Sequence, residues 1–134
     1  RAYAEVTGIE SAQIRRDSAD LARTIRELIL AANDGKAPSY VVSGASGAHD
    51  ATGAEKTALD ALSATYRGIS GMTGHMREAQ FPLALALAAI SVWKGEAFAP
   101  LDASEKDAEG PISEAIVTIV GATRAEGAAK LVRV

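Results

Sequence analysis

The first clear pattern in the chain is an apolar stripe at helical spacing. Its members are Leu21, Ile25, Leu28 and Ile29. This spacing predicts an amphipathic helix that continues to Ala32, with Asp17 or Ser18 placed to cap its start. The Gly and Pro residues within positions 33–38 then end it.

A second helix is predicted from a capping pattern. Thr52 is followed three residues later by Glu55, the T-x-x-E arrangement of a capping box. Leu59 and Leu62 supply the buried stripe of the helix that it opens. We therefore interpret Glu55 as a helix cap and not as a general base, and we assign residues 45–53 to a loop.

The third predicted helix is apolar nearly all round. It covers residues 79–94, with Pro82 in the first turn, where proline is tolerated, and Gly95 placed to end it. A helix without a polar face is normally buried on more than one side, which we expect here. Its large apolar side chains are interpreted as core or subunit interface and not as the lining of a ligand tunnel; they are Phe81, Leu83, Leu85 and Leu87.

Five short apolar runs predict strands between and after these helices. They are residues 2–9, 39–44, 66–70, 114–122 and 127–134. Strands that alternate with helices favour a sheet that is largely parallel, and the short turn between the last two runs favours an antiparallel pair. The predicted fold class is α/β: a single domain over residues 1–134, with a mixed, mainly parallel sheet of about five strands and helices on both faces.

Composition narrows the choice of function. The chain has 134 residues, a formal net charge of −3 and no cysteine, which excludes disulfides, thiolate metal ligands and a cysteine nucleophile within this chain. Basic residues are not clustered, so no nucleic-acid partner is expected. No apolar run is long enough to span a membrane, and we expect a cytoplasmic protein. The chain opens on Arg1 and not on methionine, so we expect a piece of a longer or processed product.

Generic catalytic motifs are weak. The segment SGASG (Ser43 to Gly47) lacks the Gly-Lys-Ser/Thr ending of a phosphate-binding loop. His49 and His75 have no companion at metal-ligand spacing, so neither a metal nor a cofactor is expected. No Gly-x-Ser-x-Gly elbow surrounds Ser43 or Ser46, which argues against a serine hydrolase.

Two longer arrangements carry more information. They are the loop and helix SGASGAHDATGAEKTALDAL and the turn SGMTGHMREA, which leads into the apolar helix and then FAPLD. Their order and spacing resemble the C-terminal half of the β-ketoacyl-acyl-carrier-protein synthases, in the thiolase-like superfamily. The resemblance covers nearly the whole chain and implies one thiolase-like half, with the N-terminal half absent from it.

The resemblance also implies where the family's catalytic residues fall. Counting back from Glu55, the first histidine falls at Gly44, and the lysine falls at Ser70. The second histidine falls at His75 and is kept. The resemblance makes Thr73 and Phe81 candidate substrate contacts near it. The nucleophilic cysteine belongs to the missing half.

Three functions remain compatible with these residues. The loop SGASGA, reduced to small residues where the family has its first histidine, resembles the chain-length factors, noncatalytic relatives that pair with an active ketosynthase in a heterodimer. The kept His75 departs from many of them, which change the second histidine. The first alternative is an active condensing acyltransferase whose cysteine lies on another segment or chain, and the second is a stand-alone binding or structural module. The resemblance implies as partners the missing half or a second ketosynthase-like chain, and an acyl carrier protein. Because Gly44 and Ser70 supply no catalytic side chains beside it, we interpret His75 as a residue that holds a turn.

Overall fold

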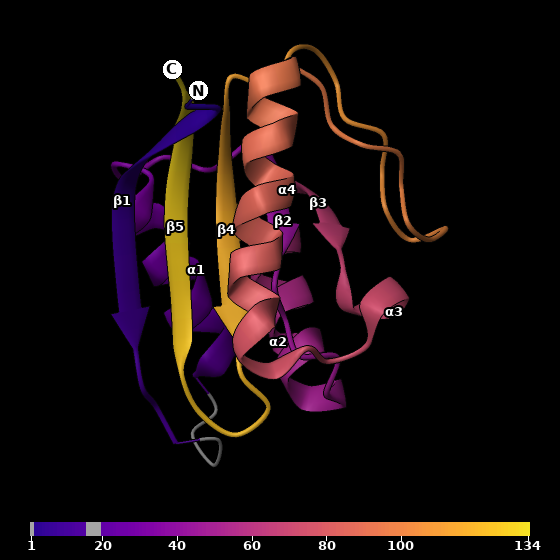
Figure 1. Ribbon diagram of the computed structural model, residues 1–134. Coiled ribbons are helices and arrows are strands. Elements are labelled where there is room, and N and C mark those ends of the chain that lie inside the picture. Colours follow the sequence, from indigo (N-terminus) through magenta and orange to yellow (C-terminus); the bar gives the residue numbers. More distant parts are fainter. Residues whose placement is uncertain (1, 16–19) are drawn as a thin grey trace.

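The computed structural model describes residues 2–15 and 20–134, which form one sheet between two layers of helices (Figure 1). The strands are β1 (Ala4–Ala12), β2 (Tyr40–Ser43), β3 (Thr65–Gly68), β4 (Glu114–Val120) and β5 (Glu126–Arg133). The helices are α1 (Leu21–Ala32), α2 (His49–Ala61), the single turn α3 (Ser70–Thr73), the 3-10 turn η1 (Arg77–Ala79) and α4 (Gln80–Lys94).

The sheet is mixed, in the order β1-β5-β4-β2-β3. Strand β2 pairs in parallel with β3 and β4, whereas β5 pairs antiparallel with β4 and β1. The predicted five-stranded α/β sheet and its antiparallel closing pair are confirmed. Parallel and antiparallel pairings are equally frequent among the described strands, because β1 joins the edge of the sheet beside β5 and not beside β2.

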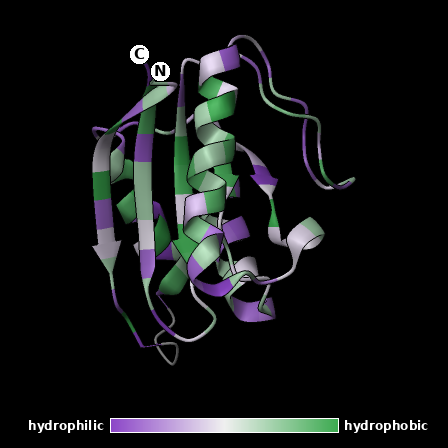
Figure 2. Cartoon of the chain, in the orientation of Figure 1, coloured by the Kyte–Doolittle hydropathy of each residue, from purple (hydrophilic) through white to green (hydrophobic). Residues whose placement is uncertain are grey.

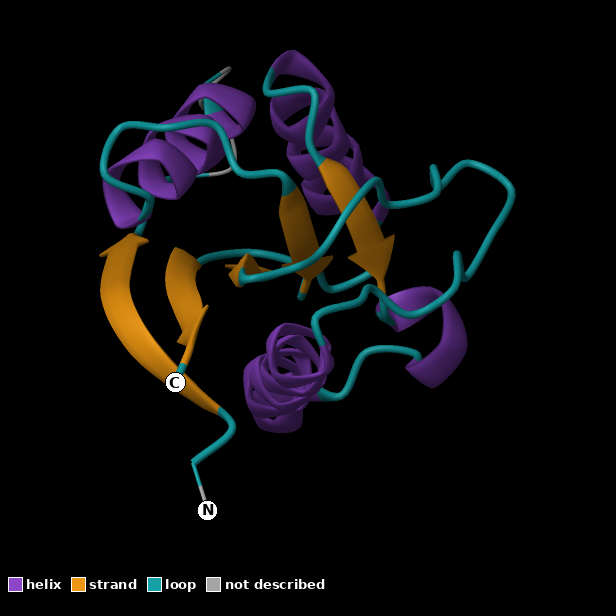
Figure 3. Cartoon of the chain, turned by 90° about the horizontal axis from the view of Figure 1, so that it is seen from above, coloured by secondary structure: helices purple, strands orange, loops and turns teal. Residues whose placement is uncertain are grey.

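Helices cover both faces of this sheet, as predicted. Figure 3 shows α1 and α2 together on one face and α4 on the other. Val41 and Ile116 point into the core under α1 and α2, whereas Val42 and Val117 point into the core under α4. Successive side chains of a strand face opposite ways, so the central strands β2 and β4 are buried on both sides.

Helix α4 is strongly apolar, which Figure 2 shows along its length. Ala84, Ala88 and Val92 are fully buried against the sheet, and Gly95 ends the helix with a φ of 79° as its N–H bonds to a carbonyl in the last turn. The expectation that α4 is buried on more than one side is wrong for the described chain. Ile90 is 45% exposed, since nothing in the described part of the chain covers its outer face.

Other boundaries differ from the predictions. Helix α2 starts at His49, so Thr52 lies inside it and the predicted capping box does not form. The first strand runs from Ala4 to Ala12, later than expected, and the proposed caps Asp17 and Ser18 lie outside the described residues. Within the described residues, every helix is too short or too polar to cross a bilayer.

Candidate functional site

The parallel strands β2 and β3 end side by side, and a cavity of about 360 Å³ lies beside their carboxyl ends. In α/β sheets this edge is where ligands usually bind. Several polar side chains line the cavity, among them Ser43, Glu55, Lys56, Tyr66, Ser70 and Asp102. We call it the Glu55 cavity.

Glu55 is the buried acid of this cavity. Its side chain comes from α2 and is only 2% exposed. The Ser43 hydroxyl of β2 donates to Glu55 Oε2 at 2.5 Å, and the Thr118 hydroxyl of β4 donates to Oε1. Glu55 therefore joins the helix to the two central strands. The interpretation of Glu55 as a helix cap is wrong, because α2 begins six residues before it and turns its side chain inward.

Burial changes the acidity of this carboxyl group. Removal from water raises the pKa of Glu55, and the two hydroxyl hydrogen bonds oppose part of that rise. No ion pair joins Glu55 to a basic side chain in the described part of the chain. The nearest lysine along the helix, Lys56, bonds instead to Asp60 at 2.8 Å. The carboxyl group is held by neutral donors alone.

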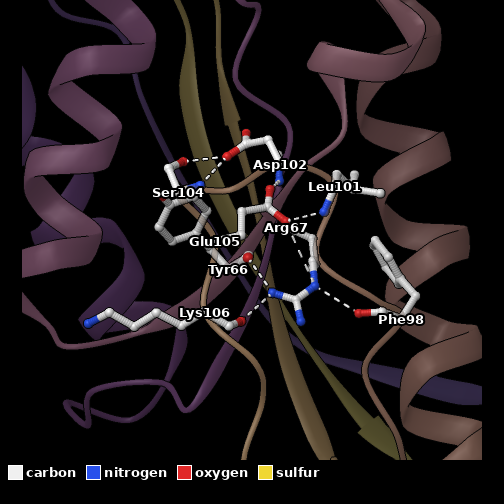
Figure 4. A network of polar contacts seen from close by, with 9 residues as sticks. Tyr66, Arg67, Phe98, Leu101, Asp102, Ser104, Glu105 and Lys106 are labelled. Carbon is white, nitrogen blue, oxygen red and sulfur yellow. Dashed lines mark hydrogen bonds and ion pairs between the residues drawn. The ribbon is translucent and has the colours of Figure 1, made fainter.

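A second buried network borders the cavity and includes Arg67 of β3. Figure 4 shows its guanidinium group between the carbonyl groups of Phe98 and Lys106, in the segment that follows α4, and that of Tyr66 in β3. Arg67 donates to the carbonyl oxygens of Phe98 and Lys106, each at 2.8 Å, and to that of Tyr66 at 2.9 Å. The side chain is almost fully buried, so these bonds replace water around a permanent charge.

Glu105 completes this network from the same segment. It accepts the Gly68 N–H at 2.6 Å and the Leu101 N–H at 2.8 Å, and lies 3.9 Å from Arg67 Nε (Figure 4). The bond to Gly68 occupies a backbone donor of β3, whose outer edge pairs with no strand among the described residues. The polar segment 98–111 therefore covers the outer edge of β3 and one wall of the cavity.

Gly44 directly follows β2, where the resemblance predicted the lost first histidine. A Cβ atom at this position would lie 2.2 Å from the carbonyl oxygen of Thr118. Real Cβ contacts are not this short, so no residue with a side chain fits without a backbone shift. The backbone of the neighbouring strand takes the space in which a catalytic side chain would begin.

The other predicted site residues are dispersed. Ser70 lines the Glu55 cavity, whereas His75 and Thr73 are exposed and do not border it. Phe81 borders a separate hollow, beside Ile9 and Ile119. The structure thus brings Ser70 near the end of β2 but does not assemble His75, Thr73 and Phe81 around it.

A buried glutamine missed by the sequence analysis links the His75 turn to the segment that follows β2. Gln80 is 1% exposed; its side chain accepts the Met76 N–H at 3.1 Å and donates to the Ala45 carbonyl at 3.2 Å. This tether positions the turn relative to the cavity without contributing chemistry. The one signal for Gln80 in the sequence is that it is a polar residue at the start of a strongly apolar helix.

The described residues contain no group of three or more His, Cys, Asp or Glu side chains placed to hold a metal ion. The polar groups that do converge are carboxyl and hydroxyl groups, which bind ligands by hydrogen bonds and charge.

Comparison with known proteins rests on structure alone. No family model matches the sequence, and no curated protein matches it. Among solved structures, ketosynthase twelve of the bacillaene polyketide synthase from Bacillus amyloliquefaciens superposes with a TM-score of 0.72 over 98% of this chain, at 12% identity. The chain has the fold of part of a ketosynthase domain. An oxazolomycin ketosynthase domain from Streptomyces albus also gives a TM-score of 0.72, over 100% of this chain at 14% identity.

The extent of these matches also bears on function. The chain spans 30% of the bacillaene ketosynthase chain and 46% of the oxazolomycin one. At such identities the likeness shows the fold alone. What those enzymes do is therefore a starting point for a proposal, and it does not describe this chain.

Proposed function

We propose that this chain is a noncatalytic, ketosynthase-like part of a fatty-acid or polyketide condensing complex, similar in role to a chain-length factor. One observation carries the proposal: Gly44, where the family resemblance predicts a catalytic histidine, has no room for a side chain. Ser70 has no charge where a lysine is expected, and His75 is exposed and away from the Glu55 cavity. Oxyanion stabilisation needs several aimed donors, and these three positions do not supply them.

The proposal includes a partner. The chain spans less than half of each matched ketosynthase chain, and the outer face of α4 exposes Ile90. We propose that a second ketosynthase-like segment or chain packs against this one and carries the nucleophilic cysteine. An acyl carrier protein then delivers substrate to that partner.

A condensation assay tests the proposal. The natural protein that carries this chain is combined with an active ketosynthase from the same organism and malonyl-loaded acyl carrier protein. We expect no product from the protein alone, and an altered product length when it joins the ketosynthase. His75→Ala is expected to leave the condensation rate unchanged, as is the control His49→Ala, which also changes an exposed histidine.

Other outcomes lead to the alternatives. A condensation rate that falls at least about tenfold in His75→Ala alone identifies an active enzyme in which His75 works in a site completed by another segment. If the ketosynthase neither binds the protein nor changes its products, the stand-alone binding or structural module is correct and the proposal is wrong.

A further inference from the structure

The Glu55 cavity has a buried acidic floor without a cationic partner. The residues that line it include the buried Glu55 and Glu105 and the exposed Asp102, and Lys56 is the one basic residue among them. Lys56 is half exposed and bonds to Asp60. Arg67 accompanies Glu105, which leaves the buried Glu55 as the acid without a nearby opposite charge.

Acceptor groups in the cavity remain available. A carboxylate offers about four hydrogen-bond acceptor positions, and the Ser43 and Thr118 hydroxyls occupy two on Glu55. Ser70 lines the same cavity, and its side chain is partly exposed. Leu59 and Tyr66 add apolar surface to the walls. A ligand with several donors on a compact positive head and a short apolar body matches this combination.

We propose that the Glu55 cavity binds the primary ammonium group of a small organic ligand, with the Glu55 carboxylate as its counter-ion. An ammonium group carries three donors, which suit the free acceptor positions of Glu55 and the Ser70 hydroxyl. A volume of about 360 Å³ accommodates a small molecule and not a macromolecular segment. The proposal does not depend on the proposed role in condensation. Of the positions that the resemblance assigned to the family's catalytic residues, it uses only Ser70.

Ammonium binding is coupled to proton release from Glu55. The ligand binds the ionised carboxylate, so its affinity rises with pH while the amine stays protonated, which holds to about pH 9. Lys56, Tyr66, Asp102 and Glu105 also border the cavity. Hydrogen bonds from Ser104 lower the pKa of Asp102, and Asp60 raises that of Lys56, so both keep their charge between about pH 5 and pH 8.

Titration of the full chain with n-butylamine hydrochloride tests the proposal. We expect saturable NMR shifts of the amides around Ser43, Ala45 and Ser70, with tighter binding near pH 8 than near pH 5. Sodium chloride at equal ionic strength and the neutral n-butanol are expected to give no such shifts. Glu55→Gln, which keeps the shape and removes the charge, is expected to weaken the affinity at least about tenfold. Asp50→Asn removes an exposed charge from the same helix and should change nothing.

A tethered ammonium group provides a second test if Glu55→Gln does not fold. Ser70→Lys is expected to fill the cavity, abolish the response to butylammonium and raise the melting temperature near pH 8. Ser70→Met has a similar length without charge and should lack that gain. The proposal is overturned if butanol binds as well as butylammonium, if no saturable binding occurs, if Glu55→Gln binds equally, or if Ser70→Lys is no more stable than Ser70→Met.

Discussion

Gly44 illustrates how the backbone of one strand restricts a residue of another. Because its Cβ would meet the Thr118 carbonyl oxygen at 2.2 Å, we expect Gly44→Ala to lower the free energy of unfolding by about 3 kcal/mol. Urea denaturation measures this change. Gly53→Ala is the matched control: Gly53 lies in α2 with open space around it, so alanine there should stabilise by about 0.5–1 kcal/mol. Equal effects of the two substitutions would contradict the packing argument.

The buried carboxyl of Glu55 links stability to pH. Its folded-state pKa is raised above the usual 4.5, so its contribution to stability is fully present below that value and is lost as pH rises through the raised pKa. We expect the wild-type protein to lose stability relative to Glu55→Gln between about pH 5 and pH 8, by at most about 1.4 kcal/mol per pH unit. Urea unfolding of both proteins across this range measures the difference. A wild-type gain relative to Glu55→Gln would show that the folded state favours the carboxylate.

At the scale of elements, the segment after α4 is ordered by one buried arginine. Arg67→Met removes donors from three backbone carbonyls and leaves Glu105 without its cation. We expect a loss of about 3–5 kcal/mol in the free energy of unfolding. Limited proteolysis should also cut residues 98–107 earlier than in the wild type. Lys94→Met, which breaks only the exposed pair with Glu96, is expected to change stability by less than about 1 kcal/mol. An equal loss in both variants would mean that Arg67 does not order the segment.

Prediction of the helices and strands succeeded where the hydrophobic periodicity and the helix-ending residues agree. The stripe from Leu21 to Ile29 and the glycine at position 95 located α1 and the end of α4. It failed at α2, because the T-x-x-E pattern is also compatible with a glutamate that faces inward. A local pattern does not reveal that Ser43 and Thr118, far apart in the sequence, offer that glutamate two hydroxyl groups.

At the scale of the whole molecule, one sheet edge exposes apolar side chains. Strand β1 is the outermost strand, and Tyr3, Val6 and Ile9 near or within it are 47%, 45% and 68% exposed. Edge strands with apolar surface favour association. We expect the isolated chain to bind a hydrophobic dye and to increase in size with concentration in sedimentation. Ile9→Lys should lower the dye signal. A compact monomer without dye binding would contradict the need for a partner.

The sequence by itself determined the α/β class, the order of helices and strands and the antiparallel closing pair, because these depend on local periodicity and turn residues. It also suggested a ketosynthase-like arrangement, which agrees with the structural matches in fold. Gly44 and Ser70, the positions that the resemblance singled out, lie near the carboxyl ends of β2 and β3. Ser70 lines the Glu55 cavity, as do Ser43 and Ala45 on either side of Gly44.

Only the tertiary structure decided the chemistry of that edge. Whether Glu55 caps a helix or is buried beside the cavity depends on the direction in which α2 runs over the sheet. Whether residue 44 has room for a side chain depends on the distance to the Thr118 carbonyl, which lies 74 residues away in the sequence. Burial and close approach arise between segments distant in sequence, and no pattern within one segment records them.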